Sequence, residues 1–498
     1  MLSFKVFFLI GFAIYIGIMI AIGVFCSRGK NSGENFLTGG GKLPLYLIFA
    51  TMGATLIGTG SSIGATSNGF KFGFGGAAYG LGAGIGMVML VLVVRNAGMR
   101  KRGILTMAEE AQFLYNGNKH IRDVMGFMMY LIEVVWLGNH INGGSTYLGF
   151  VTGLDPVLCK LISVLAFGVY VIIGGYLAVV WTDLIQLIIL LVGFVSIMSI
   201  AIPTAGGWPE IARTLTATGK AGNLSFYGYQ SKGWMWVISM IWSVAIPCLG
   251  TPTYRMRLYT AKDDKTAVRG FTLSAILLFA FSFLPAIIGM AAYTIAAKNG
   301  AAEVLQHPDY AFTYVATTVL GPVLGLIFMI SGLSATMSSG DSDAIAGTSI
   351  FIEDIYPIVT KKSVPPEKIG KLSRIVTLLT LLLAFLATLF AKDVIAYISN
   401  VIGAIIPGVS IAMLLGAKWK RVTWQGGLSA VGSGTLFGVM FLAINPFKTM
   451  ILNTFTGPAI PATIIALIFG IVVSLCTHDK KLSEDERMKL VVACRGKV

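Results

Sequence analysis

Long apolar runs separated by short polar breaks occupy almost the whole chain. Each run holds about 20 residues or more, the length that an α-helix needs to cross the hydrocarbon core of a bilayer. The pattern therefore predicts an all-α, polytopic membrane protein. The expected membrane-spanning helices number thirteen and lie at residues 4–26, 43–69, 75–97, 122–152, 157–177, 179–203, 233–259, 266–294, 320–353, 371–391, 394–416, 424–443 and 459–477.

Composition agrees with this class. Only 12% of the 498 residues are charged, whereas a soluble domain carries about 25%. The first apolar run is too long for a signal-peptide core, and no small-residue cleavage site follows it. We expect this run to be retained as a span.

The distribution of basic residues predicts the orientation. With the N-terminus outside and the C-terminus in the cytoplasm, 28 of the 37 Lys and Arg residues fall in cytoplasmic loops and adjoining helix ends. This is the positive-inside pattern. It explains the net charge of +15 without a nucleic-acid partner, and it predicts a multi-pass protein of the inner or plasma membrane.

Two spans contain helix-breaking residues. The second holds four glycines between Thr51 and Gly64, and the seventh holds Pro247 and Pro252. Interruptions at corresponding positions are typical of transporter sites built from unwound helices, although glycines also permit close helix packing. We expect two five-helix repeats, 43–203 and 233–416. Residues 1–42 then hold the first helix and a cytoplasmic loop, and residues 417–498 hold two further helices and a cytoplasmic tail.

The densest polar cluster at membrane depth lies in the ninth span, from Ser331 to Asp343. Residues three and four positions apart share one face of a helix. Ala335, Ser338, Ser339 and Ser342 thus form a stripe whose hydroxyls and carbonyls are hard oxygen ligands, suited to an alkali cation. Asp341 and Asp343 imply either a partner or a hydrated position near the cytoplasmic end.

Two more acids lie within predicted spans. Asp183 follows Trp181 at the start of the sixth span, where it serves either as a helix cap or as a functional acid. Glu133 lies three residues before Trp136 and has no basic neighbour in the sequence.

In order and spacing, these elements resemble the sodium:solute symporter family with its LeuT-type core, over roughly residues 5–450. The resemblance rests on Ala54-Thr55-x-Ile57, Ala335 with Ser338 and Ser339, Trp181-Thr-Asp183, and Gly250-x-Pro252 with Arg257. It implies a core sodium site made by the carbonyls of Ala54, Ile57 and Ala335 and the hydroxyls of Ser338 and Ser339.

Within the family, Glu133-x-x-Trp136 and Met337-Ser-Ser-x-Asp-Ser342 resemble the branch of high-affinity choline transporters. The chain is also similar to bacterial proline and sialic acid sodium symporters. Similarity to the sialic acid carriers implies a second sodium site at Asp183, Asp341 and Ser342. Asp341 replaces a serine there, which would strengthen cation binding or make the site titratable.

The expected solute site contains Ser61, Trp136, Asn139, His140 and Thr251. Choline transporters carry aromatic residues where this chain has Leu56 and Thr251. A single tryptophan is a poor cage for a quaternary ammonium group, which needs several π faces. The set suits a small neutral or zwitterionic solute that forms hydrogen bonds.

Together, the sequence predicts a secondary transporter that imports a small polar organic solute with Na⁺ by alternating access. The expected solute is amino acid-like, zwitterionic or a quaternary amine. Proton-coupled symport of a small carboxylate or another organic solute, through Asp183, Asp341 or Glu133, is the main alternative. A channel and a substrate sensor are weaker alternatives. We expect no enzymatic activity, because no nucleophile–base pair or nucleotide motif is visible, and no obligate protein partner.

Overall fold

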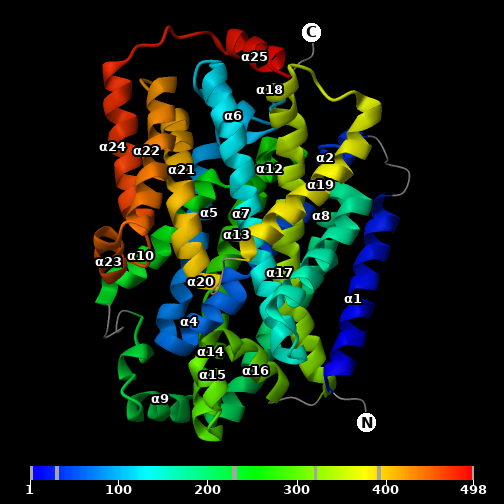
Figure 1. Cartoon of the computed structure of the whole chain (residues 1–498), viewed down its shortest axis with the longest axis vertical. Helices are drawn as coiled ribbons and strands as arrows, with labels where there is room; N and C mark the ends of the chain where they lie inside the picture. The colour runs from blue at the N-terminus through cyan, green and yellow to red at the C-terminus, as the bar shows by residue number, and fades with distance from the viewer. Residues whose placement is uncertain (1–3, 28–32, 227–232, 319–321, 390–393, 496–498) are drawn as a thin grey trace.

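The computed structural model describes residues 4–27, 33–226, 233–318, 322–389 and 394–495 as a bundle of helices (Figure 1). In the described part of the chain, eleven helices are long and apolar enough to cross a membrane. Large apolar side chains cover the outside of the bundle; Val192 is 62% exposed and Leu436 is 64% exposed. Polar side chains lie inside, which is the arrangement that a hydrocarbon environment favours.

The helix boundaries follow the chain in two groups, with η marking short π-helical or 3₁₀ turns. The first group is α1 (Phe4–Ser27), α2 (Gly33–Thr38), α3 (Leu45–Leu56), η1 (Gly60–Gly64), α4 (Ala65–Phe72), η2 (Gly73–Ala77), α5 (Ala78–Val94), α6 (Met107–Leu114), α7 (Lys119–Thr152), α8 (Pro156–Ala205), α9 (Gly207–Ala217), η3 (Ala221–Leu224), α10 (Gly233–Ala245), α11 (Pro247–Gly250) and α12 (Pro252–Thr260). The second is α13 (Asp264–Phe281), α14 (Phe283–Asn299), α15 (Ala302–Gln306), η4 (Pro308–Tyr310), α16 (Ala311–Thr318), α17 (Pro322–Ile350), η5 (Phe351–Ile355), α18 (Tyr356–Thr360), α19 (Pro366–Thr388), α20 (Val394–Tyr397), η6 (Ile398–Ile402), α21 (Gly403–Lys418), α22 (Trp424–Ala443), α23 (Asn445–Thr454), α24 (Ala459–Cys476) and α25 (Glu484–Ala493).

The expected number of thirteen spans stays a prediction. The residues of α8 cover two of the expected spans and are kinked at Gly175, whose backbone is not helical and whose φ of 60° is accessible to glycine at little cost. The apolar segment 60–94 joins the end of the second expected span to the third. Residues 320–321 and 390–391, at the ends of two expected spans, lie outside the described residues.

Two helices at the centre are broken where the sequence predicts it. Residues 57–59 separate α3 from η1, and Thr251, with extended backbone angles, separates α11 from α12. Pro252 occupies the first turn of α12, after the break, and Pro247 occupies the first turn of α11, before it; at these positions the missing N–H of proline costs nothing. The breaks are therefore encoded locally.

The long helix α17 lies in the middle of the bundle, where it packs against α8, α7, α3 and α1. Helices α22 and α24 lie at one edge and α1 at the opposite edge (Figure 1). The start of α1 and the helix α25 lie at opposite ends of the bundle (Figure 1). We call the end that carries α25 and α6 the C-terminal end. This arrangement places the polar segment of α17 directly beside the break in α3.

Candidate functional site

The break after α3 brings backbone carbonyls to the face of α17. Ile57 at the C-cap has φ −88° and ψ 60°, outside the helical region, and its N–H bonds the carbonyl of Gly53. Gly58 follows, and a Cβ atom there would collide with Ser339 Oγ and lie 2.7 Å from His140 Cε1. Glycine is needed here because the backbone approaches its neighbours so closely.

Oxygen atoms from α3 and α17 converge at this point. Ser338 Oγ lies 3.0 Å from the carbonyl oxygen of Ala54, and Ser339 Oγ lies 2.8 Å from that of Thr55. Both hydroxyls also lie 3.3 Å from the carbonyl oxygen of Ala335. The structure thus brings together four of the five residues expected at the core sodium site. The second α3 carbonyl that α17 reaches belongs to Thr55, two residues before Ile57.

These groups fit a small hard cation. Carbonyl and hydroxyl oxygens are the ligand type that hard cations prefer, and Ser338 and Ser339 are fully buried. In the structure the two hydroxyls donate hydrogen bonds to these carbonyl oxygens. Rotating the hydroxyls would turn oxygen lone pairs inward together with the carbonyls.

Two of the three residues expected at a second cation site lie beside an arginine. Asp183 Oδ2 lies 3.4 Å from Ser342 Oγ and 3.7 Å from Arg257 Nη2. The same Arg257 nitrogen donates to Ser342 Oγ at 2.6 Å and to the hydroxyls of Thr51 and Thr55 at 2.9 and 2.8 Å. A guanidinium cation therefore already faces Asp183 and Ser342.

The third expected residue of that site has a separate partner. Asp341 Oδ2 accepts a hydrogen bond from the hydroxyl of Tyr170 at 2.6 Å. Its Oδ1 atom makes no hydrogen bond to a described residue. Asp341 and Asp183 are both fully buried, so each faces a strong penalty for charge without a compensating partner.

The sequence allows Asp343 to be either hydrated or paired with another residue; in the structure it is buried and accepts a hydrogen bond. It is 3% exposed, and its Oδ1 accepts a hydrogen bond from Thr253 Oγ1 at 3.0 Å. The same hydroxyl and the Thr253 N–H donate to Glu133, the N–H at 2.8 Å. The first residues of α12 are thereby tied to α7 and α17 together.

Three of the five expected solute residues, Trp136, His140 and Thr251, form one contiguous group. Trp136 Nε1 donates to Thr251 Oγ1 at 3.3 Å, and the Trp136 ring stacks on His140 with a centroid separation of 6.2 Å. His140 Nδ1 lies 2.9 Å from Thr59 Oγ1, and its Nε2 lies 3.4 Å from Asp343 Oδ2. The group therefore joins both helix breaks.

Ser61 and Asn139 are the remaining members. Ser61 Oγ donates to the carbonyl of Leu56 at 2.8 Å, which stabilises the break after α3. Asn139 is fully buried, and neither its amide nitrogen nor its amide oxygen has a hydrogen-bond partner among the described residues. An unpartnered buried amide is costly, so this side chain is the one in the group that most needs a ligand.

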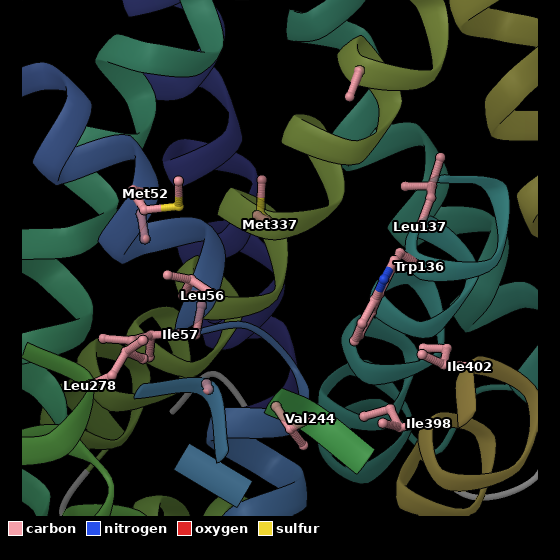
Figure 2. Close-up of a cluster of buried hydrophobic side chains, with 14 of the residues drawn as sticks. Met52, Leu56, Ile57, Trp136, Leu137, Val244, Leu278, Met337, Ile398 and Ile402 are labelled. Atoms are coloured by element: carbon pink, nitrogen blue, oxygen red, sulfur yellow. The ribbon is translucent and has the colours of Figure 1, made fainter. Parts of the chain in front are cut away.

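An apolar layer borders these polar groups. Figure 2 shows Leu56 and Ile57, from the end of α3, on one side, and Trp136 of α7 with Ile398 and Ile402 of η6 on the other. All five side chains are buried, with exposed fractions from 0% to 6%. A solute between these elements would be shielded from water.

Sequence reasoning missed the contacts between distant segments. Nothing in the chain order indicates that Arg257 reaches Thr51 and Thr55, or that Thr253 lies between Glu133 and Asp343. The available signal was the occurrence of charged residues within apolar spans, because such residues need partners.

Comparison with known proteins places this geometry in context. The family model described as the sodium:solute symporter family matches residues 36–434. The sodium/glucose cotransporter of Vibrio parahaemolyticus is 26% identical, over 88% of this chain and 85% of that protein. The sodium/proline symporter of Staphylococcus aureus is 25% identical, over 73% and 71% of the two chains.

A solved structure supports the fold. The substrate-bound, outward-open structure of a Na⁺-coupled sialic acid symporter superposes with a TM-score of 0.77. It is 19% identical in sequence and is matched over 96% of this chain and 99% of that one. The arrangement of helices described above is therefore the LeuT-type fold.

Proposed function

Because this chain belongs to the sodium:solute symporter family, we propose that it imports a small polar organic solute together with Na⁺. Sodium is the coupling ion of the family. The proposed location is the inner or plasma membrane, with the N-terminus outside and the C-terminus in the cytoplasm. The observation that carries the proposal is the convergence of α17 hydroxyls and α3 carbonyls at the break after α3.

In this proposal, one sodium ion binds the core site formed by Ala54, Ile57, Ala335, Ser338 and Ser339. Binding links α3 to α17 and orders residues 57–59. Because His140 contacts Thr59, ordering of the break also fixes one side of the solute group. Coupling between two sites is reciprocal, so the solute should tighten sodium binding as well. The membrane potential adds about 2.3 kcal/mol per charge per 100 mV to inward movement.

A second sodium ion would use Asp183, Asp341 and Ser342. Arg257 Nη2 donates to Ser342 at 2.6 Å, so this ion requires the guanidinium to withdraw from Ser342. The ion would then replace the arginine as the cation that faces Asp183.

The solute would bind Ser61, Trp136, Asn139, His140 and Thr251. We propose an amino acid-like, zwitterionic or quaternary amine solute. Asn139 supports a hydrogen-bonding solute, because its amide offers both a donor and an acceptor without a partner. The Trp136 ring, which is oriented by its hydrogen bond to Thr251, offers one π face to the solute.

Transport would proceed by alternating access. In this proposal, segments 43–203 and 233–416 are the two five-helix units that move around the site, each carrying one broken helix. Segments 1–42 and 417–498 flank them. The breaks supply the hinges, since backbone without helical hydrogen bonds changes conformation at low cost.

Thermal unfolding of the purified protein tests this function. The melting temperature is measured with amino acids, quaternary amines, carboxylates and sugars, in sodium and in potassium at equal ionic strength. A compound that stabilises the protein only in sodium identifies the solute class and supports coupling. Equal stabilisation in both salts would contradict sodium coupling and favour the proton-coupled alternative, through the buried acids.

The variant Asn139→Leu tests the solute site. Without ligand it should unfold at the same or a higher temperature, because a buried unpartnered amide is removed. Stabilisation by the solute should be lost while stabilisation by sodium persists. Full retention of the solute effect would exclude Asn139 from the site.

A further inference from the structure

The short helix α6 contacts α7, α12 and the region of α25 at the C-terminal end of the bundle. It begins with Thr106 as N-cap, whose hydroxyl accepts from the Glu109 N–H. Two adjacent acids then point to different elements. Glu109 is fully buried and Glu110 is 1% exposed, so both depend on their cationic partners.

Glu110 holds the half-helix that follows the second break. Arg255 Nη1 of α12 donates to Glu110 Oε1, and the Tyr259 hydroxyl donates to Glu110 Oε2. Arg255 is fully buried. The position of α12 relative to α6 is therefore set by one carboxylate that binds two α12 side chains.

Glu109 is held by the C-terminal helix region. Arg495, two residues after α25, donates to both Glu109 oxygens at 2.6 Å and to the carbonyl of Gly103 at 2.8 Å. A bidentate arginine–carboxylate pair fixes orientation as well as distance. Arg122 of α7 lies 3.7 Å from Glu109 and 3.4 Å from Asp354 of η5.

Additional contacts seat α25 on the α6 region. Val491 is fully buried, and its carbonyl accepts from Arg122 at 3.5 Å. Gln112 donates to the carbonyl of Leu490 at 3.3 Å, and Arg102 pairs with Glu484 at 2.8 Å. The helix α25 is therefore docked on α6 rather than free.

A cavity of about 20 Å³ lies where α6 meets α12 and α17, lined by Met107, Met256 and Ser349 among others. This volume holds about one water molecule. Asp343 precedes Ser349 by less than two turns of α17 and accepts a hydrogen bond from Thr253 at the start of α12. Any movement of α12 away from α6 would widen this cavity toward the solute group.

We infer that Arg495 is a positioning residue for transport. It holds α6 in place, α6 in turn holds α12, and the C-terminal end of the bundle thereby stays closed. The inference rests on the proposed alternating-access function and adds the element that controls opening. Loss of the Arg495 contact lets α6 shift, which weakens the hydrogen bonds from Arg255 and Tyr259 of α12 to Glu110. The C-terminal helix region thereby sets how readily the solute site opens at this end.

Cysteine labelling tests the inference without a known solute. In full-length protein with its five native cysteines replaced by serine, Met256→Cys places a thiol at the cavity. Met256 is 6% exposed, so a bulky maleimide reacts only when the cavity opens. The labelling rate is measured in sodium and in potassium, with and without Arg495→Ala.

We expect Arg495→Ala to raise the rate about tenfold, which corresponds to about 1.4 kcal/mol. Arg495→Lys should recover part of the wild-type rate, because it keeps the charge but not the bidentate geometry. Lys489→Ala is the matched control, since it removes a charge from an exposed position of α25 and should leave the rate unchanged.

Two results would overturn the inference. One is an equal rate in wild type and Arg495→Ala. The other is a parallel rise in the labelling rate of Cys159, which is buried near the opposite end of the bundle. Cys159 is kept as the sole cysteine in a separate variant, and a rise there would indicate general loosening of the fold. A labelling rate that is the same in sodium and in potassium in every variant would instead contradict the proposed function.

Discussion

Removing the hydroxyl of Ser339 tests the core sodium site most directly. In the structure, Ser339 Oγ lies 2.8 Å from the carbonyl oxygen of Thr55 and 3.3 Å from that of Ala335. Ser339→Ala removes one of the five proposed sodium ligands. The substitution creates no steric conflict, because the methyl group of alanine occupies the position of the serine Cβ.

The magnitude follows from the exchange of partners. A hydrogen bond or contact to a charged group contributes about 1.5–3 kcal/mol net. The sodium-free state of the variant also loses the Ser339–Thr55 bond, worth about 0.5–1.5 kcal/mol. The difference, about 1–2 kcal/mol, predicts sodium binding weaker by about 5- to 30-fold, at 1.4 kcal/mol for each factor of ten. Ser338→Ala with Ser339→Ala should abolish measurable binding in the millimolar range.

The assay is the melting temperature of the purified protein as sodium replaces potassium at constant ionic strength. Ser331→Ala is the matched control, because Ser331 is buried on the same helix and its hydroxyl bonds the local carbonyl of Phe328, at 2.7 Å, and no other described residue. The control should keep the wild-type sodium midpoint. An unchanged midpoint in the Ser338, Ser339 double variant would refute the site.

Three further predictions concern the surroundings of this site. Arg257→Ala leaves Asp183 buried without its cation and should destabilise the protein by about 3–5 kcal/mol in a denaturation assay. Adding Asp183→Asn should recover part of this lost stability, and no recovery would contradict the pairing of the two residues. Gly58→Ala should cost about 1–3 kcal/mol through overpacking and weaken sodium binding, whereas Gly17→Ala, in open space, should change neither; equal melting curves would argue against the close approach at the break. Hydrogen bonds from the Ser483 backbone and hydroxyl lower the pKa of Glu486, so the cap of α25 contributes stability above the ordinary Glu pKa of about 4.3 and loses it as pH falls below that value. Hydrogen exchange of α25 should then accelerate below about pH 4 after correction for intrinsic rates, and a flat profile would contradict this.

Local sequence features predicted a large share of the fold. The apolar runs predicted an all-helical membrane protein, since a backbone in hydrocarbon must satisfy its own hydrogen bonds. Glycines after Thr55 and the prolines 247 and 252 predicted the two breaks, because both residue types act on their own backbone.

The sequence likewise predicted part of the candidate site. The stripe of Ala335, Ser338 and Ser339 on one helix face follows from helical periodicity, and the resemblance to symporters linked it to Ala54. The solute residues Trp136 and Thr251 also meet, as expected. Their roles in binding sodium and solute stay predictions, because they concern ligands and not the fold.

The partners of the buried charges were decided only by the tertiary structure. Arg257 reaches Thr51 across 206 positions of the chain, and Arg495 reaches Glu109 across 386. The sequence determined that these charges lie within or beside apolar segments and therefore require partners. Which partner each one finds depends on how the helices cross, and the crossing is set by packing summed over whole helix faces, which no local pattern of residues encodes.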